Sequence, residues 1–234
     1  VGLRVHVDSY AGGFATTQEI RSLIQGVRDA GKLTAAYLDT AGEFAPGNSV
    51  YYLASACEEV SLHPAGDLNL IGFSARTPFL RGTMDKLGIE PEFPGRGDYK
   101  TARFMYTERD FTPAHREMMG WLIDSLMEQM AGDIAASRKL TPEQVRELID
   151  RAPYFGDEAL AAGLVDRLEE WPEFTARIEA QSPAGADVVG VRAYLKRSHG
   201  SRGGARIAVV SGVGAIMRGP SGKAFGLFGS EDVM

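Results

Sequence analysis

Lys100 has the surroundings that most suggest chemistry in this sequence. It lies in GRGDYKTARF, residues 95–104, after two glycines and a tyrosine and before a Thr-Ala step. Six lysines accompany nineteen arginines, so arginine carries most of the surface positive charge. A lysine, unlike an arginine, can give up its proton when it is desolvated or lies beside another cation. Lys100 is therefore a candidate general base or amine nucleophile, but its spacing alone favours an ordinary surface amine.

Other sets of reactive residues give weaker signals. The histidines show no HExxH or paired spacing that would predict a metal site: they are His6, His63, His115 and His199. No GxSxG elbow is present, and GPSGK at 219–223 lacks the spacing of a phosphate-binding loop. Asp8 and Asp39 close predicted strands and Glu43 follows, which leaves paired carboxylates open as an acid-base site. No cofactor is predicted.

Composition restricts the class of protein. Hydrophobic residues make up 44% of 234 residues, which predicts a folded core, and a net charge of -6 with both signs interspersed disfavours nucleic acid as a partner. The single cysteine, Cys57, lies in the apolar run YYLASAC and is predicted to be a packed thiol. The chain opens without Met on a strand-like run and stops in a glycine-rich one, so we expect a piece of a longer protein.

The elements that must position Lys100 begin as a strand, a helix and a strand. Residues 2–8 are β-rich, residues 16–32 have helical periodicity with Thr16 or Thr17 as the cap, and 33–39 read as a buried strand. This order predicts a right-handed parallel crossover. The apolar positions expected to face the core are Ile20, Leu23, Ile24 and Val27.

The alternation continues toward Lys100. A helix is predicted near 50–57, a strand over 58–64, a helix near 76–86 and a strand over 89–95. The carboxyl ends of parallel strands are where α/β folds hold their chemistry. The pattern therefore predicts an α/β fold with Lys100 just beyond the end of a strand.

From Thr112 the pattern becomes helical. The helix carries an apolar stripe, which predicts a core or subunit contact: Met118, Met119, Leu122, Leu126, Met130 and Ile134. TPEQ at 141–144 has capping-box spacing, and FGDEALAAGLVD predicts a short helix that ends at Gly163.

The domain organisation follows from composition. We expect residues 1–180 to form one α/β unit with a helical extension from about 112, and 181–204 have a linker composition with a possible strand near 188–195. A fresh apolar strand, ARIAVV, then opens 205–234, which we expect to be the incomplete start of a second α/β unit.

Several segments together resemble one family. PGNSVYYLASACEEVSLHPAGDLNLIGF, GDYKTARFMYTERDFTPAHREMM, the R-K-LTPEQV run and FGDEALAAGLVD occur in the order typical of the signal peptide peptidase A (protease IV) family, Ser-Lys proteases of the ClpP/crotonase superfamily. The chain is most similar to the amino-terminal half of the long, duplicated form. This resemblance implies an α/β, ClpP/crotonase-like fold of repeated ββα spiral units with a parallel sheet, plus a helical extension.

The resemblance also assigns roles. Lys100 matches the family's general base, which accepts the proton of a serine nucleophile. Asn48 stands where short family members have that serine, and Ser49 is one residue away, which turns a helical side chain by about 100°. Ser49 is thus an alternative nucleophile, but the resemblance implies that the working serine belongs to the second repeat and that this piece alone is inactive.

Further residues are expected to support the base. Tyr99 and Thr101 flank Lys100 and are candidates to position its amine, with plain packing and helix capping as the alternative. Gly12 and Gly13, in SYAGG, resemble the family's oxyanion turn and are expected to be vestigial here.

The family also implies the partners. They are peptide substrates, namely cleaved signal peptides and hydrophobic segments bound by strand-like pairing, the protein's own second repeat, and further copies in a homo-oligomer. The family location is the cytoplasmic membrane, reached through a segment outside this chain, with the active site on the extracytoplasmic side. Two alternatives stay open: a crotonase-type acyl-CoA enzyme, and a non-catalytic scaffold repeat of a ring.

Overall fold

The computed structural model describes residues 2–8, 12–43, 45–197, 215–217 and 227–229. The chain divides into two compact units, residues 1–186 and 187–234. The first unit contains every predicted site residue.

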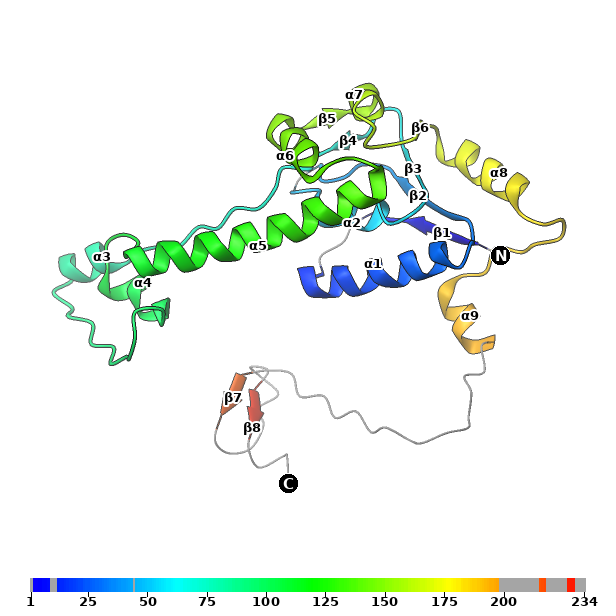
Figure 1. Ribbon diagram of the computed structural model, residues 1–234. Helices are drawn as coiled ribbons and strands as arrows, with labels where there is room; N and C mark the ends of the chain where they lie inside the picture. Colours follow the sequence, from blue (N-terminus) through cyan, green and yellow to red (C-terminus); the bar gives the residue numbers. More distant parts are fainter. Residues whose placement is uncertain (1, 9–11, 44, 198–214, 218–226, 230–234) are drawn as a thin grey trace. The chain divides into compact units, whose positions relative to one another are not determined.

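A four-stranded parallel sheet forms the centre of the first unit (Figure 1). Its spatial order is β1-β2-β3-β6, and every neighbouring pair is parallel. The strands are β1 Leu3–His6, β2 Thr34–Leu38, β3 Glu59–Leu62 and β6 Arg167–Leu168. The predicted α/β class with a parallel sheet is confirmed.

Strand β2 shows why the sheet needs cover on both sides. All five of its residues are buried. Ala36 and Leu38 belong to the main core, whereas Ala35 and Tyr37 face a second cluster with Phe174. Successive strand residues point to opposite faces, so this apolar run requires a helical layer on each side.

The helical layers are unequal. The main core packs between the sheet and several helices, with a two-stranded antiparallel pair, β4 and β5, beside them. These elements are α1 Phe14–Asp29, α2 Asn48–Ala54, α5 Pro113–Arg138, α6 Pro142–Arg151, α7 Gly156–Ala161, β4 Asp67–Leu68 and β5 Tyr154–Phe155. The smaller cluster on the opposite face is covered by α8, Trp171–Gln181.

The face that α1 buries differs from the predicted one. Leu23 is 67% exposed, so its assignment to the core face was wrong, and Arg21 is 1% exposed. The helix begins at Phe14 with Gly13 as its cap, and Thr17 is a buried position within it rather than the cap. The orientation of α1 about its axis places the Arg21 guanidinium between α2 and α5. There it donates hydrogen bonds to residues of both segments in place of water.

The route to Lys100 also differs from prediction. Residues 89–95 form no strand, α2 ends at Ala54, and the helix predicted over 76–86 is only α3, Arg81–Lys86. The chain instead leaves the core at Gly72, and Lys100 does not follow a sheet strand. A strand at 89–95 would have needed a neighbouring strand, and most of its side chains are exposed here.

The helix caps and helix ends predicted after residue 111 are confirmed. Thr112 caps α5, and its side chain accepts the His115 amide at 3.2 Å. Thr141 and Gln144 form the predicted capping box of α6. Gly163, with φ of 71°, follows α7 and closes it. Of the apolar stripe on α5, Met130 and Ile134 enter the core.

The second unit is described by itself. Residues 191–197 form a helix, α9 Val191–Arg197, so the strand expected near 188–195 was wrong. Two short parallel strands are β7 Ala215–Met217 and β8 Leu227–Gly229. The strand expected over 205–210, like His199, lies outside the described residues. The linker and the second repeat stay predictions.

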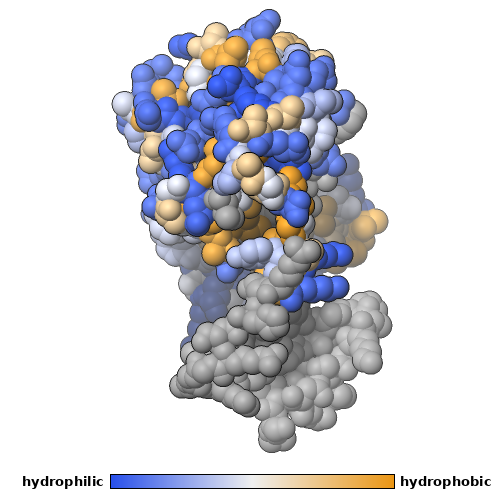
Figure 2. Space-filling model, turned by 90° about the vertical axis from the view of Figure 1, so that its right-hand side faces the viewer, coloured by the Kyte–Doolittle hydropathy of each residue, from blue (hydrophilic) through white to orange (hydrophobic). Residues whose placement is uncertain are grey.

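Hydrophilic residues cover much of the face shown in Figure 2, with smaller hydrophobic groups between them. Within the described parts of the chain, no helix has both the length and the apolar character to cross a bilayer.

Candidate functional site

Lys100 lies in an arm, residues 73–123, that extends from the core of the first unit (Figure 1). Its outgoing leg, residues 73–79, is extended and is followed by α3. The chain then passes through a loop to a short 3-10 turn, Thr101–Arg103, and α4, Phe104–Thr107, before α5 returns it to the core.

A small aromatic cluster holds the outer part of the arm together. His115, which is 4% exposed, lies 4.7 Å from Phe111, 6.0 Å from Phe104 and 6.1 Å from Phe79 between ring centroids. The Leu80 amide adds a 2.7 Å hydrogen bond to the Met105 carbonyl. These contacts join the outgoing leg, α4 and the start of α5, so the segment that carries Lys100 has its own fold.

Lys100 itself is exposed. It precedes the 3-10 turn, with Gly97 in the left-handed region (φ 79°) three residues before it. The ion pairs within the described part of the arm join arginines to Asp85, Glu90 and Asp110 and leave Lys100 out. The dry environment that a lysine base requires is therefore not formed by the described residues.

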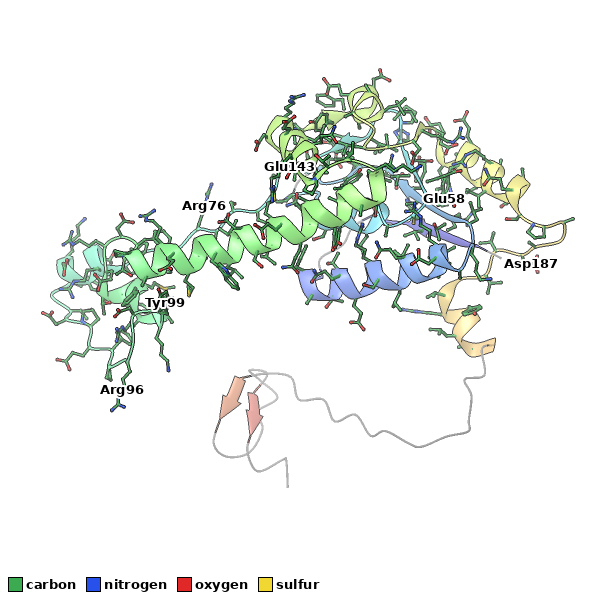
Figure 3. The ribbon with its side chains drawn as sticks, viewed as in Figure 1. Glu58, Arg76, Arg96, Tyr99, Glu143 and Asp187 are labelled. Atoms are coloured by element: carbon green, nitrogen blue, oxygen red, sulfur yellow. The ribbon has the colours of Figure 1, made fainter. Side chains whose placement is uncertain are left out.

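Tyr99 and Thr101 flank the lysine differently. The Tyr99 hydroxyl donates to Glu117 of α5 at 2.7 Å, and this hydrogen bond raises the pKa of Tyr99. Thr101 is half-buried and makes no side-chain hydrogen bond with a described residue. Tyr99 therefore links the GDYKTA block to α5. Figure 3 shows Tyr99 and Arg96 at one end of the arm, far from Glu58 and Glu143 on the core.

Gly12 and Gly13 lie between β1 and α1, and both are exposed. The Gly13 carbonyl accepts the Thr17 amide and the Thr17 hydroxyl, each at 3.0 Å. Gly13 thus caps the start of α1, and neither glycine lies on the arm with Lys100.

Asn48 and Ser49 open α2 in the core. Asn48 is buried and both of its amide atoms bind the backbone of Gly72, whereas Ser49 is half-buried. The two ends of α5 separate Ser49 from Lys100. Tyr99 binds Glu117, and Tyr52 of α2 binds Asp133, sixteen residues further along α5 or about 24 Å. The structure therefore does not bring Ser49 and Lys100 together.

The other reactive residues occupy separate places. His6 and Asp39 bond at 2.6 Å, and His63 bonds Glu170 at 3.1 Å, all on the surface of the core. No group of three or more potential metal ligands occurs among the described residues. Burial raises the pKa of the Cys57 thiol to about 12, so the prediction of a packed thiol is confirmed.

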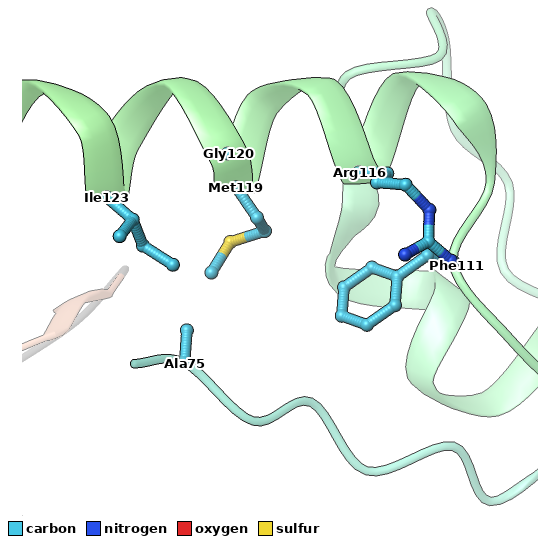
Figure 4. A pocket seen from close by; sticks show the side chains of 6 residues that line it. All are labelled: Ala75, Phe111, Arg116, Met119, Gly120 and Ile123. Atoms are coloured by element: carbon cyan, nitrogen blue, oxygen red, sulfur yellow. The ribbon is translucent and has the colours of Figure 1, made fainter. Parts of the chain in front are cut away.

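A shallow pocket of about 190 Å³ lies between the outgoing leg and α5 (Figure 4). Its lining is formed by Ala75, Phe111, Arg116, Met119, Gly120 and Ile123. The pocket is on the arm, as is Lys100, and most of its lining is apolar.

A comparison with models of protein families shows which family the chain belongs to. Residues 39–184, which include the GDYKTA block and the R-K-LTPEQV and FGDEALAAGLVD segments, match the model of peptidase family S49. The chain belongs to this family. As an S49 protein, it has Lys100 within the matched region and Gly12 and Gly13 before it.

Named relatives agree with this assignment. The chain is 27% identical to the chloroplastic serine protease SPPA of Arabidopsis thaliana, over 70% of this chain and 24% of that one. It is 29% identical to a putative protease of Synechocystis over 79% of this chain and 64% of that one, and 29% identical to protease 4 of Salmonella typhi over 72% and 29%. The chain thus spans between about a quarter and two thirds of these relatives.

Solved structures with a similar arrangement include a peptidase from Plasmodium falciparum, with a TM-score of 0.41, 12% identity and coverage of 72% of this chain and 80% of that one. ClpP1 from Listeria monocytogenes has a TM-score of 0.40 and 12% identity over 73% and 75%.

The S49 segments after the arm have a structural role that spacing did not reveal. Arg138 donates to both Asp166 oxygens, at 2.8 and 2.9 Å, and to the Gly163 carbonyl. Asp166 also accepts the Val60 amide at 2.8 Å, at the edge where β3 meets β6. The R-K-LTPEQV and GLVD segments are therefore joined by one arginine-carboxylate pair.

This pair makes stability depend on pH. Burial raises the pKa of Asp166, but hydrogen bonds from Arg138 and the Val60 amide outweigh it, and the net pKa is lowered. A lowered folded-state pKa stabilises the protein above the unfolded value of about 3.9, and the contribution disappears as pH falls through the folded value. Arg138→Ala is expected to cost about 2 kcal/mol at pH 7, a fall in Tm of roughly 6 °C.

The measurement is a thermal melt at pH 7 and pH 3. The difference between Arg138→Ala and the unmodified protein should shrink at pH 3, because below about pH 3.9 the unfolded state takes up a proton that the paired Asp166 resists. Arg151→Ala is the control, because Arg151 pairs with Glu147 on the surface at 3.9 Å and should change Tm little. An Arg138→Ala deficit that is the same at both pH values would contradict this account.

Proposed function

We propose that this chain is the base-bearing half of a Ser-Lys endopeptidase. Lys100 accepts the proton of a serine as the serine attacks a peptide carbonyl, and returns it to the leaving amine. The nucleophile belongs to the protein's second repeat or to another copy. The observation that carries this proposal is the exposed Lys100, which belongs to the S49-matched region and has no ion-pair partner among the described residues of the arm.

The arm suits a base that works on another chain segment. The α5 residues that bind Tyr99, next to Lys100, and Tyr52, near Ser49, are about 24 Å apart along the helix, which argues against a dyad of Lys100 with Ser49. Assembly with a second repeat or a further copy would cover the arm and exclude water from the amine. Such desolvation favours the neutral form that a general base needs. The same assembly accounts for the apolar residues that the arm exposes: Leu87, Ile89, Phe93, Trp121 and Leu122.

The outgoing leg supports a peptide substrate. No backbone amide or carbonyl of residues 73–79 bonds to another described residue, so this extended segment can pair with a substrate strand. The pocket beside Ala75 offers an apolar lining to a substrate side chain. These features fit hydrophobic peptides such as cleaved signal peptides. The complete protein would act at the cytoplasmic membrane, through a segment outside this chain, with its site on the extracytoplasmic side.

The position of the nucleophile tests this proposal. In the complete protein, a fluorophosphonate probe should phosphonylate one serine, with fluoride leaving, and peptide mass spectrometry should locate the label outside residues 1–234. The Lys100→Ala variant should label at least tenfold more slowly, because the serine has lost its base. Label on Ser49, or a labelling rate that does not depend on Lys100, would refute the split dyad.

A further inference from the structure

Asn48 uses its whole side chain on one backbone position. It is 5% exposed, its Nδ2 donates to the Gly72 carbonyl at 2.6 Å, and its Oδ1 accepts the Gly72 amide at 3.1 Å. A primary amide offers both a donor and an acceptor, so it can satisfy both backbone groups of one residue, as a neighbouring strand would. Serine, with a single hydroxyl, cannot reproduce this pair.

The backbone at Gly72 is restricted in conformation and closely packed. Its φ of 76° lies in the left-handed region, and a Cβ there would come within 3.2 Å of Ile149 and 3.5 Å of Met127. The next residue, Phe73, packs edge-on against Phe14 at 5.5 Å. The chain therefore leaves the core in a direction set by the conformation and packing of Gly72.

Beyond Gly72 the outgoing leg has no comparable fastening. Residues 73–79 make no backbone hydrogen bond to another described residue, and the next such bond is from Leu80 to Met105 at 2.7 Å, within the arm. The other leg, α5, is held to the core by the burial of Met130 and Ile134. The Asn48 amide is thus the last hydrogen-bonded contact of the outgoing leg with the core.

We infer that Asn48 is a positioning residue: its amide pair with Gly72 fixes the outgoing leg and thereby sets where the arm presents Lys100. The catalytic part of this inference rests on the proposed function of Lys100. With the fastening lost, the outgoing leg keeps only its packing contacts at Gly72 and Phe73, so its direction, and with it the position of the arm about α5, is less strictly fixed. The position at which the family resemblance expects a nucleophile therefore carries a structural amide in this chain.

Asn48→Asp in the complete protein tests the inference. It keeps the size of the side chain but places a carboxylate oxygen against the Gly72 carbonyl, where the amide donated. Hydrogen exchange of the Gly72 amide, read from peptides that begin well before Gly72, should accelerate at least tenfold at pH 8, and kcat for a hydrophobic peptide ester should fall about tenfold. At pH 5 or below, protonation lets the introduced carboxyl donate again, so the exchange rate should return toward that of the unmodified protein. Both proteins are measured at the same pH, so that the intrinsic exchange rates are equal.

Phe174→Leu is the matched control. Phe174 belongs to α8 and is buried against the opposite face of the sheet, so this variant lowers stability without touching Gly72. Its Gly72 amide exchange and its kcat should stay unchanged. Asn48→Ser provides a second variant with the same expected exchange if Asn48→Asp does not fold. The inference is overturned if both Asn48 variants behave as Phe174→Leu does.

Two further outcomes separate this inference from the proposed function. If exchange rises but kcat is unchanged in an enzyme that requires Lys100, Asn48 fastens the leg without setting the base, and the positioning role is wrong. If Lys100→Ala retains full cleavage, the proposed function fails, and the exchange of the Gly72 amide alone decides whether Asn48 fastens the arm.

Discussion

Lys100→Ala, made in the complete protein, is expected to lower kcat for a hydrophobic peptide ester by a factor of about 10² to 10⁴. General-base catalysis contributes this much. KM should change much less, because the proposed pairing of the substrate with the outgoing leg does not involve the lysine. Steady-state kinetics with one substrate measures both values.

Two companion variants show whether the lost group is a base. Lys100→Arg keeps a positive charge at the same place but cannot give up its proton at neutral pH, so it should be as inactive as Lys100→Ala. Lys86→Ala removes an exposed lysine from the same arm and should retain normal kcat. An active Lys100→Arg variant would mean that this position supplies charge and not proton transfer.

The same variants separate the alternatives. A scaffold repeat predicts normal cleavage in every Lys100 variant, with assembly lost only when the exposed apolar residues of the arm are replaced by charges. A crotonase-type acyl-CoA enzyme predicts saturable binding of acyl-CoA in a calorimetric titration, whereas a peptidase predicts none.

Arg21→Ala is expected to destabilise the first unit by about 3–5 kcal/mol, which corresponds to a fall in Tm of roughly 10 °C. Arg21 donates to Ser55 Oγ at 2.8 Å, to the Asp133 carbonyl at 2.7 Å and to Ser137 Oγ at 2.6 Å, and it also binds the Tyr52 carbonyl. Its removal takes the guanidinium donor from Ser55 Oγ, Ser137 Oγ and the Asp133 carbonyl, while the Tyr52 carbonyl keeps the bond from Ser55 Oγ at 3.1 Å. Burial lowers the pKa of Arg21, which nevertheless stays charged and holds α1, α2 and α5 together.

Thermal unfolding followed by circular dichroism provides the measurement. Ser22→Ala is the control, because Ser22 is the next residue of α1, is exposed, and bonds only within its own helix, to the Gln18 carbonyl at 2.9 Å. Its Tm should change by about 1 °C or less. A fall of only that size in Arg21→Ala would show that the buried cluster contributes little to stability.

Local patterns predicted the elements that depend on local physics. Thr112, the TPEQ box and Gly163 each act within one turn of their own helix, so their roles could be derived without the fold. The strand at 33–39 was predictable because a strand buried on both faces is largely apolar. The run 89–95 looked similar but found no neighbouring strand to bond with, and strand formation is a property of pairs.

The candidate site was predictable only in part. Neither composition nor spacing distinguished Lys100 from a surface amine, and the assignment depended on the family resemblance and the S49 match. Its place on an arm was not foreseen. Among the residues that reasoning from the sequence missed, Asn48 offered one signal, because an amide stood where a hydroxyl was expected. Arg138 and Asp166 offered another, as the charged members of two family segments.

The amino-acid sequence by itself determined the α/β class, the helix boundaries set by caps, and the presence of a lysine in a family-specific block. The tertiary structure alone decided that α1 turns Arg21 inward and Leu23 outward, that Asn48 binds Gly72, and that α5 keeps Ser49 apart from Lys100. The physical reason is the distance along the chain over which each interaction acts. Caps and periodicity act over one or two turns, whereas a buried guanidinium, an amide pair across 24 residues and the length of a helix acquire their meaning only when distant segments pack together.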